Sequence, residues 1–219
     1  MLILDLPVQF NLEAAMEGVS IPYEWDADYQ ARIGVLAHEG DPDDVVWCNI
    51  DPCFVFHPLN AYDAADGTII ADVVRHPRMF AGRTSLPSGG KPSLVRWVID
   101  PATGSVTESV LSDVPQEFPR VDERVVGKKH RYGYGVYSSK ESTYAGAIKH
   151  DLEAGTSEWR RYGPGRTCQE PVFVPRHATA EEDDGWLLAY VHNEATGTTD
   201  IEVWESPQLH RRAARAGSS

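Results

Sequence analysis

Residues 45–63 read Val45-Val46-Trp47-Cys48-Asn49-Ile50-Asp51-Pro52-Cys53-Phe54-Val55-Phe56-His57-Pro58-Leu59-Asn60-Ala61-Tyr62-Asp63. This segment predicts two strands that meet at Asp51-Pro52, because proline cannot donate to a strand ladder and presets a turn. The second strand, residues 53–56, is a continuous apolar run, which indicates burial on both faces. His57 ends the run, and leaving a buried imidazole unpaired costs about 1–3 kcal/mol. From these residues alone, His57 is either a structural histidine with a hydrogen-bond partner or a metal ligand.

The residues around His57 form a wider motif. Residues 52–63, with Phe56-His57 and Asn60-Ala61 among them, resemble the iron-ligand segment of the carotenoid cleavage oxygenase family, which includes bacterial lignostilbene-type dioxygenases. Members of this family carry a Phe-His-x-x-Asn-Ala motif, and its histidine is one of four that hold a non-haem Fe(II) ion. The resemblance therefore implies that His57 is a metal ligand and that Fe(2+) is the cofactor.

Two glutamate segments resemble the same family. Gln116-Glu117-Phe118-Pro119-Arg120 is similar to a Glu-Phe-Pro segment, and residues 169–176 around Glu170 are similar to a second signature. A metal-bound imidazole points one nitrogen at the metal and donates its other N–H outward, and a carboxylate at that place fixes the ring. The resemblance implies this role for Glu117 and, toward the last ligand histidine, for Glu170. The alternative for Glu117 is a surface glutamate beside a turn.

The composition limits the partners of the chain. It has 33 Asp and Glu against 20 Lys and Arg, a formal net charge of −13, which argues against nucleic acid or an anionic membrane surface as the main partner. Cys48, Cys53 and Cys168 give neither an even disulfide framework nor a CxxC zinc pattern, which indicates reduced thiols in a cytoplasm. No stretch approaches the roughly 20 apolar residues of a spanning helix, and residues 1–5 turn acidic too soon for a signal peptide. We therefore expect a soluble, cytoplasmic protein.

A repeat indicates the architecture. Two predicted hairpins, residues 96–111 and 146–162, share an Asp-x-x-x-Gly-[Ser/Thr] turn and lie about 50 residues apart. A repeat of this length with four short strands per unit is typical of a β-propeller, while a sandwich with Greek-key connections is the alternative. The family resemblance implies a seven-bladed propeller with a loop cap over the metal. On this spacing the chain holds about four blades, so, with what the resemblance implies, we expect an all-β, partial seven-bladed propeller.

The predicted elements are mostly strands separated by turn-forming residues. Asn11 is expected to cap one short helix over residues 12–16, and residues 81–92 are expected to form a flexible loop. Strands are predicted over residues 2–10, 31–38, 68–75, 94–100, 105–111, 131–137, 144–150, 157–162, 171–175, 185–192 and 200–205. Histidines outside the motif are expected in loops or on the surface; they are His38, His76, His130, His150, His177 and His192.

The resemblance covers residues 1–209 and corresponds to roughly the latter half of a family member. Of the four ligand histidines only His57 has its motif here, since two belong upstream and the last belongs to a Pro-x-Gly-[Phe/Tyr]-His segment after Leu209. Residues 210–219 are assigned as a non-family tail, in which the neighbours of His210 do not match. We expect a truncated or out-of-frame form that is inactive by itself.

The sequence thus predicts part of an oxygenase. Such an enzyme cleaves a conjugated C=C bond of a carotenoid, apocarotenoid or stilbene with O2 at a non-haem Fe(II) centre, so its partners are a small apolar conjugated substrate and O2. Peripheral contact with a membrane is expected in the full-length form. The alternative is a non-catalytic β-propeller-like binding module, in which His57, Glu117 and Glu170 are packed polar residues. A hydrolytic propeller has weaker support, because no paired-carboxylate or nucleophile motif accompanies Glu117.

Overall fold

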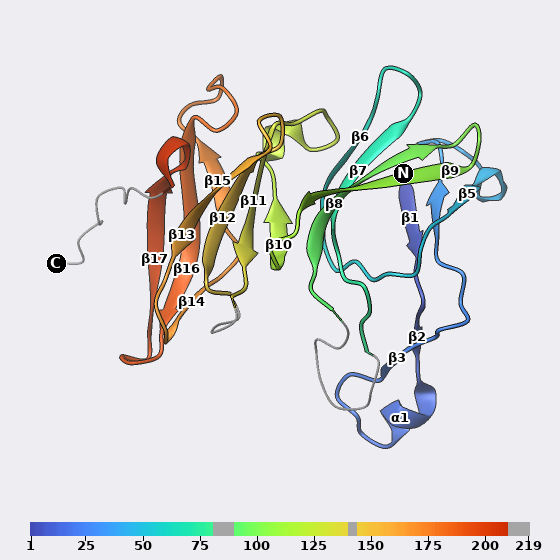
Figure 1. Ribbon diagram of the computed structural model, residues 1–219, viewed down its shortest axis with the longest axis horizontal. Coiled ribbons are helices and arrows are strands. Elements are labelled where there is room, and N and C mark those ends of the chain that lie inside the picture. Colours follow the sequence, from blue (N-terminus) through green and yellow to red (C-terminus); the bar gives the residue numbers. More distant parts are fainter. Residues whose placement is uncertain (81–89, 140–143, 210–219) are drawn as a thin grey trace.

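The computed structural model describes residues 1–80, 90–139 and 144–209, and nearly all regular structure in them is antiparallel β-sheet (Figure 1). Successive sheets stand side by side, from the N-terminal part of the chain in blue to the C-terminal part in red. Each main sheet is built from one stretch of the chain, and in the second and third sheets the strands stand in the order of the sequence. This arrangement is that of propeller blades.

The first sheet has the order β1-β4-β5 and consists of β1 (Leu2–Asp5), β4 (Arg32–Val35) and β5 (Val46–Asn49), with the 3-10 helix η1 (Pro42–Asp44) before β5. Between β1 and β4 the chain forms a hairpin of β2 (Val8–Phe10) and β3 (Tyr23–Trp25), which encloses α1 (Leu12–Met16). The predicted helix cap is confirmed, because the side-chain oxygen of Asn11 accepts from the backbone N–H of Ala14 at 2.8 Å. The strand predicted over residues 2–10 is divided at Pro7, which cannot donate to a ladder.

The second and third sheets are four-stranded meanders. The second contains β6 (Pro58–Asp63), β7 (Ile69–Arg75), β8 (Ser93–Asp100) and β9 (Ser105–Ser112). The third contains β10 (Gln116–Arg120), followed by η2 (Glu123–Val125), and then β11 (Tyr132–Tyr137), β12 (Gly146–Asp151) and β13 (Thr156–Arg161). Both predicted Asp-x-x-x-Gly turns connect the third strand of a sheet to the fourth, and Gly104 and Gly155 have φ of +71° and +66°, which glycine adopts without strain. The sequence repeat therefore marks equivalent turns of two blades.

The fourth sheet is centred on β16 (Gly185–Asn193). One edge of β16 pairs with β17 (Thr198–Glu205), and the other pairs with the short strands β14 (Arg166–Cys168) and β15 (Val172–Pro175). The 3-10 helix η3 (Ser206–Gln208) follows β17. Four strands of the described chain, β3, β6, β10 and β14, have no counterpart among the strand ranges predicted from the sequence.

Apolar side chains fill the spaces between neighbouring sheets. The cluster between the first two sheets includes Ile33, Cys48, Val73 and Trp97. The cluster between the last two includes Tyr134, Phe173, Leu187 and Trp204. At the contact between the second and third sheets, a Cβ on Gly133 would lie 2.9 Å from the end of the Leu59 side chain, so a larger residue here would require Leu59 to shift. The described residues thus form an all-β, partial and open propeller of about four blades, as predicted.

Candidate functional site

His57 is the residue directly before β6, and the segment that leads to it differs from the prediction. Residues 53–56 form no regular strand, and Phe54 alone makes an isolated bridge to His76. Burial on both faces was also a wrong prediction, because Phe56 is 39% exposed. Two alternate side chains of the run enter the core between the first two sheets, while the rings of Phe54 and Phe56 pack on each other at 4.7 Å between centroids. The apolar run therefore has one face in the core and one face outside it.

Glu117 lies on β10, the first strand of the third sheet. The pairing of β10 with β11 changes register between Glu117 and Arg120, and Phe118 has φ +53°, a left-handed conformation that is uncommon outside glycine. Bulges of this kind redirect side chains and are frequent beside functional sites. Here the irregular strand lets Glu117 reach His57 of the second sheet.

Three N–H groups donate to the carboxylate of Glu117. His57 Nδ1 donates to Oε2 at 2.8 Å, and the backbone N–H of Phe118 donates to the same oxygen at 2.9 Å. His76 Nε2 donates to Oε1 at 2.5 Å. The expected hydrogen bond between His57 and Glu117 is thus present. Because an ionised carboxylate only accepts, the neutral His57 ring carries its proton on Nδ1 and has its lone pair on Nε2.

Glu117 is ionised at neutral pH although it is largely buried. Burial by itself raises the pKa of this carboxyl, but the hydrogen bonds from His76, His57 and the Phe118 backbone outweigh burial and hold the pKa below its usual value. A permanently charged acceptor fixes the tautomer of each imidazole that donates to it. Fixed rings of this kind are typical of histidines that bind metals.

His76 was not predicted as part of this cluster. The sequence placed it in a loop or on the surface, but it is 4% exposed, and His130 and His150 are equally buried, so these three predictions were wrong. A signal for His76 is present in the sequence. Like His57, it directly precedes a proline at the end of a β-rich segment.

The cluster lines a pocket of about 760 Å³. His57, His76 and Glu117 supply polar groups to its wall. Much of the rest is apolar or aromatic, from Phe56, Met79, Pro115, Phe118 and Tyr144. A concave site with apolar walls and a few convergent polar groups is typical of small-molecule binding. The pocket therefore suits an apolar ligand held beside His57.

Glu170 does not join this cluster. It lies between β14 and β15, and its Oε1 accepts from Arg120 Nη1 at 2.9 Å; Arg120 also pairs with Glu123. A carboxylate to which no imidazole donates needs another partner, such as a cation or water. For Glu170 this partner is the guanidinium of Arg120. Within the described ranges no histidine donates to Glu170, so its role toward a ligand histidine stays a prediction.

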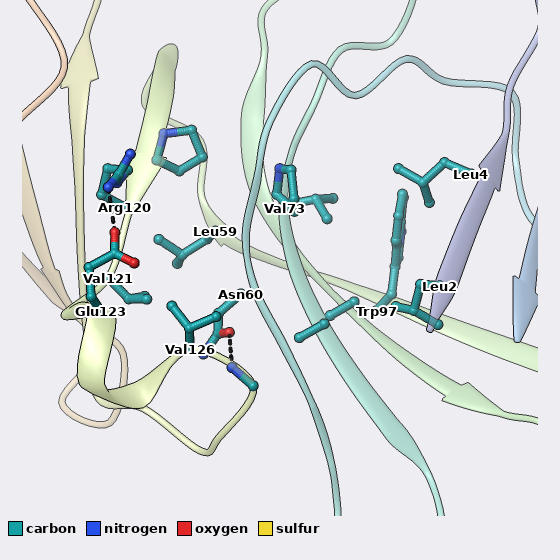
Figure 2. A pocket seen from close by; sticks show the side chains of 15 residues that line it. Leu2, Leu4, Leu59, Asn60, Val73, Trp97, Arg120, Val121, Glu123 and Val126 are labelled. Atoms are coloured by element: carbon teal, nitrogen blue, oxygen red, sulfur yellow. Dashed lines mark hydrogen bonds and ion pairs between the residues drawn. The ribbon is translucent and has the colours of Figure 1, made fainter. Parts of the chain in front are cut away.

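A second cleft, of about 450 Å³, lies where the edge strands β1, β6 and β10 face one another (Figure 2). Leu2, Leu4 and Trp97 lie on one side of it, and Leu59, Val126 and the Arg120–Glu123 pair lie on the other. First strands that converge on a common space are expected at the centre of a propeller. This cleft therefore belongs to the architecture, while the pocket beside His57 contains the cluster of His57, His76 and Glu117.

Asn60, the other polar residue of the motif, has a structural contact. Its Nδ2 donates to the carbonyl oxygens of Val125 and Lys128 at 3.1 and 3.0 Å, and its Oδ1 accepts from the backbone N–H of Gly127 at 3.0 Å. These bonds tie β6 to the turn after η2. The motif thus combines one histidine in the pocket with one asparagine that joins two sheets.

His57 has the form that a metal ligand needs. A neutral imidazole with Nδ1–H bound to a carboxylate and a lone pair on Nε2 is the usual state of a ligating histidine. In the part of the chain that the structure describes, no group of three or more His, Cys, Asp or Glu side chains could hold a metal ion. The described residues therefore supply one oriented histidine and its carboxylate partner.

Comparison with known sequences gives consistent matches. The profile of the family described as retinal pigment epithelial membrane protein (RPE65) matches residues 1–217. A carotenoid cleavage oxygenase of Mycobacterium tuberculosis is 42% identical over 188 residues, which are 80% of this chain and 38% of that protein. An apocarotenoid-15,15'-oxygenase of Synechocystis is 28% identical over 214 residues, 93% of this chain and 42% of that protein. The tail assigned to residues 210–219 lies outside the described residues, and its boundary stays a prediction.

Solved structures share the fold. Cobalt-substituted Synechocystis ACO superposes with a TM-score of 0.85 and 26% identity, over 95% of this chain and 46% of that chain. Pseudomonas brassicacearum lignostilbene dioxygenase superposes with a TM-score of 0.82 and 27% identity, over 94% of this chain and 47% of that chain. The chain spans about 40% of the length of the curated relatives that it matches.

Proposed function

Because the chain belongs to the family of RPE65 and the carotenoid cleavage oxygenases, we propose that it forms part of a dioxygenase that cleaves a conjugated C=C bond. In this reaction one O2 is consumed, the C=C bond breaks, and each of its carbons receives one oxygen atom, giving two carbonyl products. Fe(II), when bound, supplies the centre at which O2 reacts. The observation that carries the proposal is the 2.8 Å hydrogen bond between His57 Nδ1 and Glu117 Oε2.

The relatives support the substrate class and the metal. Their names describe oxygenases of carotenoids, apocarotenoids and lignostilbene, all of them conjugated molecules, and one structural neighbour was solved with cobalt substituted. The pocket beside His57 has walls of matching character, with the rings of Phe56, Phe118 and Tyr144. Such walls exclude water and orient a flat polyene by contact with its faces.

Each polar residue has one task in this proposal. His57 holds the metal through Nε2, and Glu117 fixes the ring by accepting from Nδ1. Glu170 does the same for a histidine of the Pro-x-Gly-[Phe/Tyr]-His segment. A chain with one motif histidine lacks the usual ligand number, so the 219-residue chain alone should bind Fe(II) weakly.

A chimera tests the function. In it, this chain replaces the matching segment of the Mycobacterium tuberculosis relative, which supplies the rest of the family sequence. We expect cleavage of an apocarotenoid under 18O2, with label in both carbonyl products by mass spectrometry. His57→Ala should abolish cleavage, whereas Val95→Ala, a buried change on β8 outside the pocket, should retain it. Cleavage by the His57→Ala chimera would overturn the proposal, and polyene binding without any cleavage would favour the binding module.

The surface around α1 supports a second part of the proposal, peripheral contact with a membrane. The hairpin of β2 and β3 and its helix extend beyond the sheets (Figure 1), and they expose large apolar side chains, those of Phe10, Leu12, Met16, Ile21 and Tyr23. Exposed apolar clusters mark contact with other apolar surfaces, including lipid. Among the described residues no helix is long and apolar enough to span a bilayer. A lipid-soluble polyene would reach such an enzyme from the membrane.

A cytoplasmic location is also part of the proposal. Cys48, Cys53 and Cys168 are free and buried, which agrees with a reducing compartment. Burial raises the pKa of Cys53 to about 11 and that of Cys168 to about 12. These thiols stay protonated at neutral pH and are therefore poor nucleophiles.

A further inference from the structure

His76 is held rigidly beside Glu117. Its backbone exchanges two hydrogen bonds of 2.8 Å with Phe54, and its ring meets that of Phe56 edge-on, at 88° and 5.2 Å between centroids. The side chain of His76 is 6% exposed. From this fixed position Nε2 donates to Oε1 of Glu117 at 2.5 Å.

The second ring nitrogen of His76 has no hydrogen-bond partner in the part of the chain that the structure describes. Nδ1 is buried, and among the described residues no hydrogen bond reaches it. An unsatisfied buried polar atom is destabilising, and such atoms in folded proteins call for an explanation. Because a carboxylate only accepts, Nε2 carries the proton, and Nδ1 is left as a lone pair. The position of the ring therefore satisfies an oxygen of Glu117 but leaves one nitrogen of the ring itself unsatisfied.

His57, in contrast, is only partly buried. Its side chain is 45% exposed, against 13% for Glu117. The rings of Phe56 and Phe118 contact the His57 ring, but these apolar contacts do not distinguish its two nitrogens, so the tautomer depends on the carboxylate. The carboxylate is in turn fixed by the Phe118 backbone at Oε2 and by His76 at Oε1. The buried ring of His76 thus holds the carboxylate of Glu117, and this carboxylate in turn holds the partly exposed ring of His57.

We propose that His76 is a positioning residue, which fixes the carboxylate of Glu117 so that His57 stays in its Nδ1–H tautomer with Nε2 directed to a metal ion. This inference rests on the proposed function, in which His57 is a metal ligand. His76 takes no metal itself in this assignment, because Glu117 occupies its Nε2 and protein atoms enclose its Nδ1.

The metal-free 219-residue chain tests the positioning role. With 15N-labelled histidine, ring nitrogen shifts in NMR spectra at about pH 8, where imidazoles are mostly neutral, report the tautomer of His57. His76→Gln keeps an N–H donor near the place of Nε2, whereas His76→Leu removes it. We expect His57 to remain Nδ1–H in the unsubstituted chain and in His76→Gln, and to become a mixture of tautomers in His76→Leu.

A matched control separates this effect from a general loss of stability. Val95→Ala also alters a buried side chain, on β8, but Val95 lies outside the pocket, so His57 should remain Nδ1–H in this variant. The inference is overturned by an unchanged His57 signal in His76→Leu, or by the same mixture of tautomers in Val95→Ala.

Co(II) binding by the chimera provides the second measurement. His76→Leu should weaken Co(II) binding about 10–100-fold, as for other residues that orient metal ligands, and His76→Gln should restore most of it. If the tautomer responds but no form of the chimera binds Co(II), the positioning role stands and the proposed metal function fails. If Co(II) binds and neither measurement responds to His76→Leu, the positioning role fails and the function stands.

Discussion

Arg120 Nη1 donates a hydrogen bond of 2.9 Å to Oε1 of Glu170 and so connects the first strand of the third sheet to the fourth sheet. Both side chains are partly exposed, at 35% and 42%. Exposed ion pairs contribute about 0–1 kcal/mol to stability. The pair therefore satisfies Glu170 without holding the blades together, and it leaves Oε2 of Glu170 for another donor.

Replacing Arg120 by Met should change little in the chain itself. We expect the free energy of unfolding, measured with urea, to fall by less than about 1 kcal/mol, because the ion pair is exposed.

In the chimera, Glu170→Gln should weaken Co(II) binding about 10–100-fold, because an imidazole of the Pro-x-Gly-[Phe/Tyr]-His segment loses its acceptor. A crystal structure of the chimera with this imidazole beyond a water-bridged distance from Glu170 would contradict the assignment.

Removing one partner of a buried ion pair should lower the free energy of unfolding much more. Arg96 donates to both carboxylate oxygens of Asp72, each at 2.8 Å, and Asp72 is fully buried. Burial by itself raises the pKa of Asp72, but the hydrogen bonds from Arg96 and the His130 ring 3.3 Å away outweigh burial and lower the pKa, so the carboxyl is charged.

Arg96→Met leaves the Asp72 charge without its main partner, and we expect a loss of about 3–5 kcal/mol in urea unfolding. The double variant Arg96→Met, Asp72→Asn should be more stable than Arg96→Met alone, because no uncompensated charge remains buried. Equal stability of the single and double variants would show that the charge is not the cause.

Much of the propeller could be predicted because its signals are local. The Asp100–Gly104 and Asp151–Gly155 turns are specified by residues close in sequence, and each recurs at the same place in its sheet. β10 was missed because Glu117 and Pro119 disfavour a strand, and its pairing with β11 is irregular. Short strands with a bulge and a proline contain too few alternating apolar and polar residues to be detected by their periodicity.

The site was predicted only where a motif existed. His57 and Glu117 are 60 residues apart, and only resemblance to a family brought them together before the fold was known. His76 lies 41 residues from Glu117 and belongs to no recognised motif. Burial of a single polar residue depends on which sheet packs over it, and this tertiary information is absent from local sequence patterns.

Membrane contact should depend on the exposed residues of α1. Leu12 and Met16 are 65% and 82% exposed, and burial of each in lipid is worth roughly 1.5–3 kcal/mol. Leu12→Ser and Met16→Ser should therefore each reduce co-sedimentation with phosphatidylcholine vesicles about tenfold. Val110→Ser, on β9 and 61% exposed, is the matched control and should have no effect. An equal loss for all three variants would assign the binding to general hydrophobicity.

His150 should make the stability of the chain depend on pH. The ring is buried on β12, where Nε2 donates to Gln116 Oε1 at 2.9 Å and Ser157 Oγ donates to Nδ1 at 2.8 Å. Burial lowers its pKa from 6.5 to about 4. Below pH 6.5 the unfolded state therefore binds a proton that the folded state does not, so stability falls as pH decreases from about 6.5 to about 4.

Each pKa unit corresponds to about 1.4 kcal/mol, so His150 should account for a loss of about 2 kcal/mol between pH 7 and pH 5. Glu117 and Asp72, whose pKa values are lowered from 4.5 and 3.8, contribute stability that is lost only at still lower pH. His150→Gln keeps an N–H donor but cannot titrate, so its free energy of unfolding in urea should vary by about 2 kcal/mol less over this range. His38→Gln, at an exposed position, should retain the full pH dependence, and an unchanged pH dependence in His150→Gln would show that His150 is not held neutral by the fold.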